Sequence, residues 1–252
     1  MRHWGVLVLT LSATAALAAP VAADDTIYSQ AVAHEARSSQ DRERDARELP
    51  AEVMAFSGLR PGMKVADVFG GGGYYSELIS YVVGPKGEVV LVNNKPYENY
   101  VPDEIKARLA SGRLPNVRHA VIDVNDLKLG TNTFDAVLIV LSYHDLYYVD
   151  PANGWPGIDA PRFLGQIRDA LKPNGVFLIV DHAAKAGTGK TAAQDLHRIE
   201  ESFARSDITS RGFQFEGSFE KLRNPADDLD KVVFDPAVRS RTDRFVHLYR
   251  KP

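Results

Sequence analysis

The sequence predicts one α/β domain built on a doubly wound, mostly parallel β-sheet. From residue 51 onward, short apolar segments typical of buried strands alternate with helical segments. This order favours parallel strands joined by helical crossovers. Glycines occupy positions 70–73, directly after the first predicted strand. Because open α/β sheets bind ligands beyond the carboxyl ends of their strands, the glycine run also indicates where a ligand site lies.

The individual elements follow from local patterns. Short apolar runs predict the strands, and turns rich in Gly and Pro end the helices between them. The predicted helices are 51–59, 75–83, 161–171 and 191–205, and the predicted strands are 64–69, 88–92, 117–122, 134–141, 176–180, 213–217 and 245–250. His197 falls within the last predicted helix, and we expect it to be structural.

Residues 1–23 are predicted to be a secretory signal peptide. A basic start precedes an apolar run, 5–19, and small residues come before an acidic pair. The apolar run is shorter than the roughly 20 residues of a membrane-spanning helix. We expect cleavage after Ala23, with Ala18 as the alternative site and an uncleaved anchor as the alternative role. The mature protein is expected to be periplasmic or secreted.

Composition narrows the possible chemistry and partners. The chain contains no Cys, which excludes disulfides, thiolate catalysis and zinc sites built on Cys. Its formal net charge is −3, so it has no strong electrostatic bias toward nucleic acid or anionic lipid. We therefore expect a small-molecule substrate, no nucleic-acid partner and no stable membrane association after signal cleavage. The sequence does not indicate an oligomeric state.

Residues 24–50 are predicted to form a charged helical segment ahead of the main domain, 51–252. Charges of both signs alternate over 38–48, a pattern typical of a solvated helix face with ion pairs. The alternative is a lid over a neighbouring pocket. The side chains that could form such a lid are Arg37, Arg44 and Arg47.

Three classes of ligand use a glycine-rich turn in this position. A dinucleotide site requires G-x-G-x-x-G, with a small residue at the third conserved position. If the motif is counted from Gly71, Ser76 occupies that position and is small enough. If it is counted from Gly70, Tyr75 occupies it and is too large. A nucleoside triphosphate requires G-x-x-x-x-G-K-[ST]. Residues 189–191 match the end of that motif, but Ala184 stands at its leading glycine, so we interpret this segment as a flexible loop.

The third class is indicated by a resemblance. The turn resembles the first motif of the class I S-adenosylmethionine-dependent methyltransferases, acidic-x-Gly-x-Gly-x-Gly, with Asp67, Gly71 and Gly73 at matching positions and Phe69 at the first glycine. The resemblance implies a Rossmann-like sheet with an antiparallel last strand and S-adenosylmethionine as the cofactor. It also implies that the turn packs against the methionine part of the cofactor, with Asp67 ordering the turn or meeting the cofactor's amino group through water.

Further motifs follow in the order that this family shows. Residues 123–127 and 134–137 resemble its D-x-x-x-L and F-D-x-V stretch, and 171–176 resembles its L-K-P-G-G turn. The resemblance covers about Pro50 to Arg250 and implies that Asp123 accepts a hydrogen bond from the adenine amino group. The remaining residues that it assigns to cofactor binding are Tyr74, Asn93 and Val124.

One position departs from the family pattern. Members usually carry Asp or Glu at the end of the second strand, where the carboxylate binds both ribose hydroxyls, whereas this chain has Asn93 followed by Asn94. An amide lacks the charge assistance that roughly doubles the strength of such hydrogen bonds. We therefore expect weaker cofactor binding.

A narrower resemblance links the chain to a family of exported bacterial predicted methyltransferases. It depends on the run Gly71-Gly72-Gly73-Tyr74-Tyr75, on 45–47 and 55–56, on 222–227 and on the chain ending 241–252. The resemblance supports the fold and class without identifying a methyl acceptor.

Candidate catalytic residues follow two strands that are neighbours in the resembled fold. His144 and Asp145 come after the fourth predicted strand, and Asp181 and His182 end the fifth. A base assists methyl transfer when the acceptor must lose a proton, and either His could act as that base, oriented by Asp145 or Asp181. The alternative is that each His only satisfies a loop carbonyl.

The same residues could instead bind a divalent metal, but no H-E-x-x-H or comparable spacing supports a metal site, and none is predicted. We expect a methyltransferase that acts on a small molecule. The alternatives are an exported, non-enzymatic protein that reuses the fold to bind a small ligand, and a metal-assisted enzyme of another class.

Overall fold

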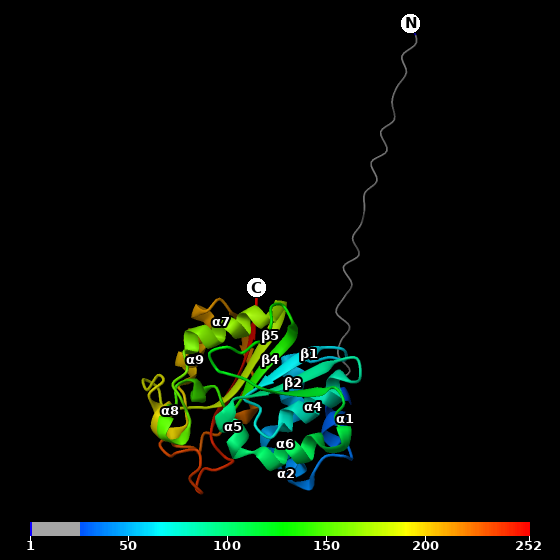
Figure 1. Ribbon diagram of the computed structural model, residues 1–252. Coiled ribbons are helices and arrows are strands. Elements are labelled where there is room, and N and C mark those ends of the chain that lie inside the picture. Colours follow the sequence, from blue (N-terminus) through cyan, green and yellow to red (C-terminus); the bar gives the residue numbers. More distant parts are fainter. Residues whose placement is uncertain (2–25) are drawn as a thin grey trace.

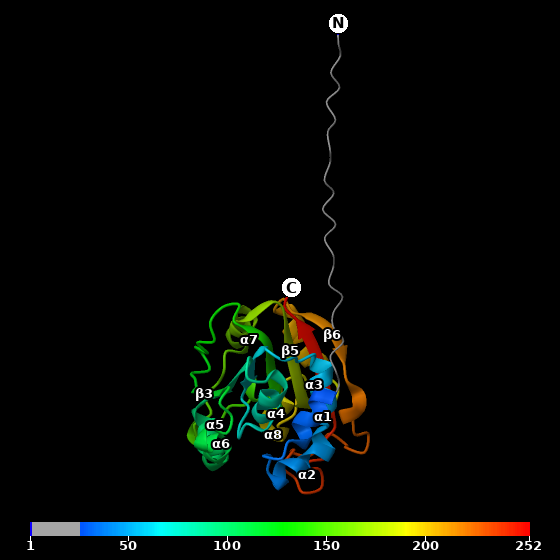
Figure 2. The ribbon, with the colours of Figure 1, turned by 90° about the vertical axis from the view of Figure 1, so that its right-hand side faces the viewer.

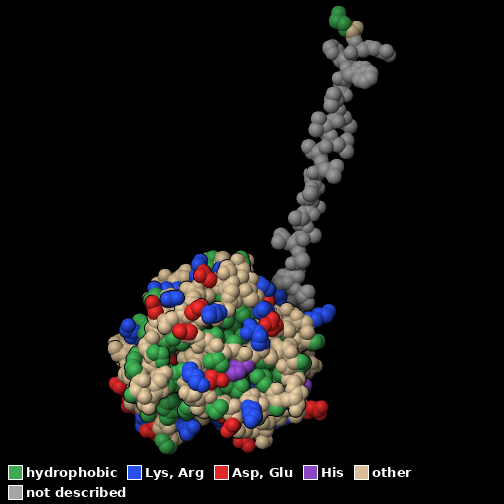
Figure 3. All heavy atoms as spheres, viewed as in Figure 1, with side chains coloured by type: hydrophobic (Ala, Val, Ile, Leu, Met, Phe, Trp, Pro, Cys, Tyr) green, Lys and Arg blue, Asp and Glu red, His purple; other side chains and the backbone are tan. Residues whose placement is uncertain are grey.

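The structure is a computed structural model that describes Met1 and residues 26–252 (Figure 1). Apart from Met1, the predicted signal peptide lies outside the described residues. None of the described helices is both long and apolar enough to cross a membrane. The face seen in Figure 3 mixes positive and negative side chains, in keeping with the small net charge.

One seven-stranded sheet, in the order β3-β2-β1-β4-β5-β7-β6, organises the described chain. The first five strands are parallel, and β7 pairs antiparallel with both β5 and β6. The predicted doubly wound, mostly parallel sheet with an antiparallel last strand is therefore confirmed. The strands are β1 (Lys64–Val68), β2 (Glu88–Asn93), β3 (Val117–Val121), β4 (Phe134–Val140), β5 (Leu171–His182), β6 (Gln214–Ser218) and β7 (Arg244–Arg250).

Helices cover both faces of the sheet. In Figures 1 and 2, α1, α3 and α4 lie over one face, and α7 and α9 lie over the other. The α-helices are α1 (Thr26–Ala33), α2 (Ser39–Glu48), α3 (Pro50–Ser57), α4 (Tyr74–Val83), α5 (Lys95–Tyr100), α6 (Pro102–Leu109), α7 (Ala160–Ala170), α8 (Ala192–Leu196) and α9 (Glu201–Ser210). Short 3-10 turns are η1 (Ala110–Gly112), η2 (His144–Leu146), η3 (Pro151–Asn153) and η4 (Glu220–Leu222).

The core is divided by the sheet into two apolar layers. Strand residues such as Ala66 and Val137 pack with α7 and α9, whereas Val65 and Leu138 pack with α1, α3 and α4. Because successive side chains of a strand point to opposite faces, a strand buried on both sides is apolar throughout. This explains why the central strands are continuous apolar runs rather than alternating ones.

The order of the strands fixes where a ligand can bind. The chain proceeds outward from β1 through β2 to β3, and then returns to the other side of β1 as β4. The crevice at this reversal, beyond the carboxyl ends of β1 and β4, is the usual ligand site of such sheets. The glycine run after β1 and the His144 turn after β4 both lie there.

The predicted helix 191–205 is wrong, because the structure breaks it into α8 and α9. His197 has a left-handed backbone with φ of 51°. Ile199 then pairs with the end of β5, donating its N–H to the carbonyl of His182 at 3.0 Å. Between them, the fully buried guanidinium of Arg198 is bonded to both carboxylate oxygens of Asp227. This buried pair holds the chain away from a continuous helix and delivers His197 to the carboxyl end of the sheet.

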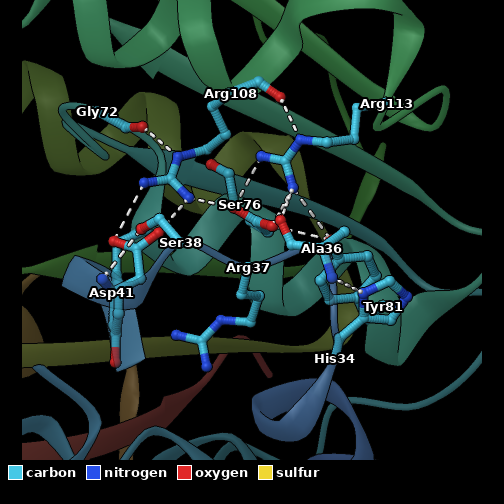
Figure 4. Close-up of polar contacts among 12 residues, drawn as sticks. His34, Ala36, Arg37, Ser38, Asp41, Gly72, Ser76, Tyr81, Arg108 and Arg113 are labelled. Carbon is cyan, nitrogen blue, oxygen red and sulfur yellow. Dashed lines mark hydrogen bonds and ion pairs between the residues drawn. The ribbon is translucent and has the colours of Figure 1, made fainter. Parts of the chain in front are cut away.

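The charged segment before the domain is tied to the glycine turn. Arg108 of α6 donates to the carbonyl of Gly72 at 2.6 Å and forms an ion pair with Asp41 of α2 at 2.7 Å (Figure 4). The same guanidinium also contacts the buried carboxylate of Glu77 on α4, which Arg113 contacts as well. Helix α2 is therefore more than a solvated face, since it closes over the turn through these ion pairs.

We predict that replacing Arg198 with Leu lowers the free energy of unfolding by about 3–5 kcal/mol, because it leaves the buried Asp227 carboxylate without its counter-ion. Chemical denaturation measures this loss. The matched control is Lys185→Ala, which removes an ion pair whose side chains are about half exposed, and a loss below about 1 kcal/mol is expected there. Equal losses in the two variants would contradict this role of Arg198.

Candidate active site

The glycine turn connects β1 to α4 and encloses a cavity of about 230 Å³. Gly71 and Gly73 have φ of 55° and 81°, in the left-handed region that glycine adopts without strain. A Cβ built on Gly71 meets no described atom within 4 Å, so this side of the turn is open. Gly73 is the residue immediately before α4, and it faces Arg108 rather than the cavity.

Phe69 stands where the family motif has its first glycine, and it also has a positive φ, of 55°. Its ring is buried between the rings of Tyr97 and Phe163, with centroids 5.1 and 5.4 Å away. Stacking and burial of a large aromatic side chain offset the strain of this backbone conformation. Phe69, in place of the family's glycine, therefore fills the core beneath the turn and leaves the turn itself intact.

Asp67 lines the cavity from β1 and is almost fully buried. Its Oδ2 accepts a hydrogen bond from the Ser76 hydroxyl at 2.6 Å, whereas its Oδ1 has no hydrogen-bond partner among the described residues. Burial raises the pKa of this carboxyl to about 6, although the Ser76 hydrogen bond opposes the rise. A cationic or hydrogen-bond-donating ligand group would satisfy the unpaired oxygen.

Asn93 closes on the turn instead of facing outward. Its Oδ1 accepts from the Gly71 N–H, and its Nδ2 donates to the Gly71 carbonyl, both at 3.0 Å. The same Nδ2 donates to Glu98 of α5 at 3.1 Å. The amide thus fixes the conformation of the glycine turn, and this use explains why Asn suits a position where the family usually has a carboxylate.

The other predicted cofactor residues are placed differently. Tyr74 lines the cavity, with its hydroxyl donating to Asp45 at 2.6 Å and the Arg44 guanidinium lying 4.1 Å from its ring centroid. Asp123 is exposed and accepts a hydrogen bond from the Asn125 N–H, and Val124 is buried in the core. Neither Asp123 nor Val124 lines the glycine-turn cavity.

Of the three candidate lid residues, Arg44 alone lines this cavity. Arg37 is buried in an ion pair with Asp45 at 2.7 Å, and Arg47 lines a separate pocket near the end of the chain. The charged segment therefore contributes one cation to the rim of the glycine turn, and the ion pairs of Arg37, Asp41 and Glu48 hold the segment in place.

A second cavity, of about 370 Å³, adjoins the first. Tyr97, Tyr100 and Leu141 line both cavities. The other residues around the second cavity are aromatic, apolar or imidazole-bearing, with a single carboxylate. They are His144, Asp145, Tyr148, Trp155, His182, His197, Val233 and Phe234.

Asp181, at the end of β5, orients His144. Its Oδ2 accepts from the His144 backbone N–H at 2.6 Å, and its Oδ1 lies 2.7 Å from His144 Nδ1. Burial opposes protonation of this imidazole, but the charges of Asp181 and Asp145 outweigh burial and raise the pKa of His144 to about 9. Of the two carboxylates expected to orient His144, Asp181 is therefore the one that bonds its ring directly.

His182 lies beside His144, with ring centroids 5.9 Å apart. Its Nδ1 is hydrogen-bonded to the hydroxyl of Thr242 at 2.7 Å, which leaves Nε2 for the cavity. Burial, with a further contribution from the charge of His144, holds the pKa of His182 well below its ordinary value. The two predicted histidines therefore share a wall, but the pKa of His144 is raised and that of His182 is lowered.

Two of the residues of this wall that the sequence did not predict contact Asp145. Tyr97 donates its hydroxyl to Asp145 Oδ2 at 2.5 Å and stacks on Phe69, so it belongs to both cavities. His197, expected to be structural, lines the second cavity with its Nδ1 3.7 Å from Asp145 Oδ1. No local motif marks either residue, because their partners lie far away in the sequence.

The sheet order and the glycine turn define the class of fold. The protein is similar to a SAM-dependent methyltransferase from Aquifex aeolicus, with a TM-score of 0.58 at 20% identity, over 91% of this chain and 99% of that one. At this identity the similarity concerns the fold. The architecture is that of the class I S-adenosylmethionine-dependent methyltransferases, as the sequence motifs implied.

Residues 59–221 match a family model described as a methyltransferase domain, which covers more than half of the chain. The chain is 32% identical over 126 residues to the ubiquinone/menaquinone biosynthesis C-methyltransferase UbiE of Idiomarina loihiensis, covering 50% of this chain and 45% of that protein. It is 31% identical over 203 residues to UbiE of Shewanella oneidensis, covering 77% and 75%. The chain thus spans about half the length of the first relative. It belongs to the methyltransferase-domain family.

We predict that Asp67→Asn gains stability relative to the unmodified protein as the pH rises from about 4 to about 6. A folded-state pKa of about 6, against an ordinary value of 3.8, means that the folded protein binds the extra proton in this window. The stability of the unmodified protein therefore falls as this proton is lost, by about 3 kcal/mol.

Denaturation of both proteins at several pH values measures this difference. Asp228→Asn, at an exposed position, is the matched control for the loss of a carboxylate. A stability difference between Asp67→Asn and the unmodified protein that stays constant from pH 4 to pH 6 would contradict a buried Asp67 that becomes charged in this range.

Proposed function

We propose that this protein transfers a methyl group from S-adenosylmethionine to a small aromatic acceptor. The observation that supports this function best is the pair of adjoining cavities at the carboxyl end of the sheet, which share Tyr97, Tyr100 and Leu141. One cavity is formed by the glycine turn, and the other by aromatic and imidazole side chains. A donor and an acceptor held in adjoining cavities have the proximity that a displacement reaction requires.

The glycine turn fits the methionine part of the cofactor. The open backbone of Gly71 allows close approach, and the unpaired Asp67 Oδ1 offers an acceptor to the amino group. The bound cofactor supplies an electrophilic methyl group on a sulfonium. At about 230 Å³ the cavity is smaller than pockets that enclose a whole ligand, typically about 300–1,000 Å³, so the turn holds only one part of it.

The second cavity favours an aromatic acceptor with an apolar extension. Tyr97, Tyr148 and Trp155 form aromatic walls, and Tyr100 and Phe234 at its edge remain 76% and 52% exposed. Large exposed apolar side chains at the edge of a pocket are typical of binding sites for apolar ligands. The relatives are named for C-methylation in ubiquinone and menaquinone biosynthesis, which also suits a ring-containing acceptor.

We propose that a histidine lining the second cavity removes the proton of the acceptor. Thr242 fixes the ring of His182 through Nδ1, so that Nε2 is the nitrogen that accepts the proton. Asp181 positions His144, and Asp145 lies between His144 and Tyr97. In this arrangement His182, His144 and Asp145 are the candidate catalytic residues, and Asp181 and Thr242 are positioning residues.

We further propose that the protein works outside the cytoplasm, as a member of the exported methyltransferase family that its motifs resemble. The signal-like residues 1–23 and the absence of Cys support this location. A second function, non-enzymatic binding of a small ligand, is favoured by one observation. Both polar groups of the Asn93 side chain are already bonded to Gly71, at the position where the family binds ribose.

We predict that the purified protein binds S-adenosylmethionine and its demethylated product with micromolar affinity, about −8 kcal/mol, in calorimetric titration. Gly71→Ala is expected to weaken binding at least tenfold, because its Cβ projects into the open side of the turn. Gly112→Ala is the matched control. Its backbone φ of 65° is also left-handed and its Cβ also meets no described atom within 4 Å, but it lies outside the site.

Two results would contradict the proposal. If folded protein gives no heat with either compound at millimolar concentration, methyl transfer is excluded and the ligand-binding function takes its place. If Gly71→Ala and Gly112→Ala weaken binding equally, the cofactor does not bind at the glycine turn.

A further inference from the structure

We propose that His144, Asp145 and His197 bind one divalent transition-metal ion at the wall of the second cavity. Each residue offers one ligand atom, and the three atoms lie within 4.8 Å of one another. His144 and Asp145 come from η2 after β4, and His197 comes from the break between α8 and α9. All three line the cavity, so a bound ion would have a coordination position open to a ligand there.

The spacing of the ligand atoms is typical of a shared ion. His144 Nε2 and His197 Nδ1 lie 3.3 and 3.7 Å from Asp145 Oδ1. Charge-assisted hydrogen bonds are shorter, about 2.7–2.9 Å, and the other hydrogen bonds of this cluster measure 2.5–2.7 Å. Two ligands at about 2.0–2.2 Å from a tetrahedral ion stand about 3.3–3.6 Å apart. The spacing of the His144 nitrogen from Asp145 lies within this range, and that of the His197 nitrogen lies just beyond it.

The surrounding hydrogen bonds orient these ligands as metal sites require. Metal-binding His residues usually donate their second ring N–H to a carboxylate, which directs the other nitrogen at the ion. Asp181 bonds His144 Nδ1 at 2.7 Å in this way. Likewise, Tyr97 bonds Asp145 Oδ2 at 2.5 Å and leaves Oδ1 toward the two imidazoles.

The charge of the cluster also favours a cation here. The buried carboxylates of Asp145 and Asp181 contact opposite ring nitrogens of His144, and the nearby cation Arg198 is already bonded to Asp227. A divalent ion that displaces the proton from His144 Nε2 would balance the two carboxylates.

Two imidazoles and one carboxylate are a ligand set for zinc and for other first-row divalent ions. This inference rests on the proposed function for its role, because an acceptor oxygen bound at the open position would lose its proton more readily to His182. Metal binding itself can be tested without any methyl acceptor or cofactor.

The test uses chelator-treated full-length protein, titrated with Co²⁺ while the visible absorption of cobalt is recorded, and with Zn²⁺ in a calorimeter. One equivalent of each ion is expected to bind. Asp145→Asn and His197→Ala are expected to abolish the site. Asp181→Asn keeps every proposed ligand but alters the bonds that Asp181 makes to the ring and backbone of His144, and it is expected to weaken binding about 10- to 100-fold.

His34→Ala is the matched control, because His34 stacks on Tyr81 far from this wall, and its variant is expected to bind like the unmodified protein. Folding of each variant is checked by circular dichroism. The proposal is overturned if the unmodified, folded protein binds no stoichiometric ion, or if binding survives in both Asp145→Asn and His197→Ala. Because S-adenosylmethionine binding is measured separately, a failed metal site leaves the proposed methyl transfer standing.

Discussion

The buried carboxylate of Asp181 determines how the carboxyl end of the sheet is arranged. A buried carboxylate is less costly when its oxygens are bonded, and those of Asp181 accept from the backbone N–H groups of His144 and His182 and bond the ring of His144. One side chain thereby joins the ends of β4 and β5. The position of the His144 ring and that of the His182 backbone follow from it.

The glycine turn is held in a comparable way, from two directions. Asn93 bonds both backbone groups of Gly71 from β2, and Arg108 bonds the Gly72 carbonyl from α6. Flexible residues are therefore kept in one conformation by rigid neighbours, so less entropy is lost when a ligand binds. Since Arg108 also pairs with Asp41, the segment ahead of the domain takes part in forming the site.

Much of the fold could be predicted from sequence because its signals are local. Apolar runs and Gly-Pro turns indicate the strands, and Asp67 with its glycines indicates the turn and the class. The position of His197 could not be predicted, because the helix is broken by Arg198, whose partner Asp227 is 29 residues away. Tyr97 was missed for the same reason, since it bonds Asp145 across 48 residues. The hydrogen bonds from the Asn93 side chain to Gly71 likewise join two separate parts of the chain.

Tyr97 gives the two cavities a shared element, since its ring stacks beneath the glycine turn while its hydroxyl bonds Asp145. Any ligand that moves this ring in one cavity alters the hydrogen bonding of the wall of the other. Ligand binding in the two cavities is then thermodynamically linked, and this linkage is reciprocal. If a ligand in one cavity changes the affinity of the other cavity by some factor, a ligand in the other changes the affinity of the first by the same factor. A single tyrosine thus provides a route for cooperativity within one small domain.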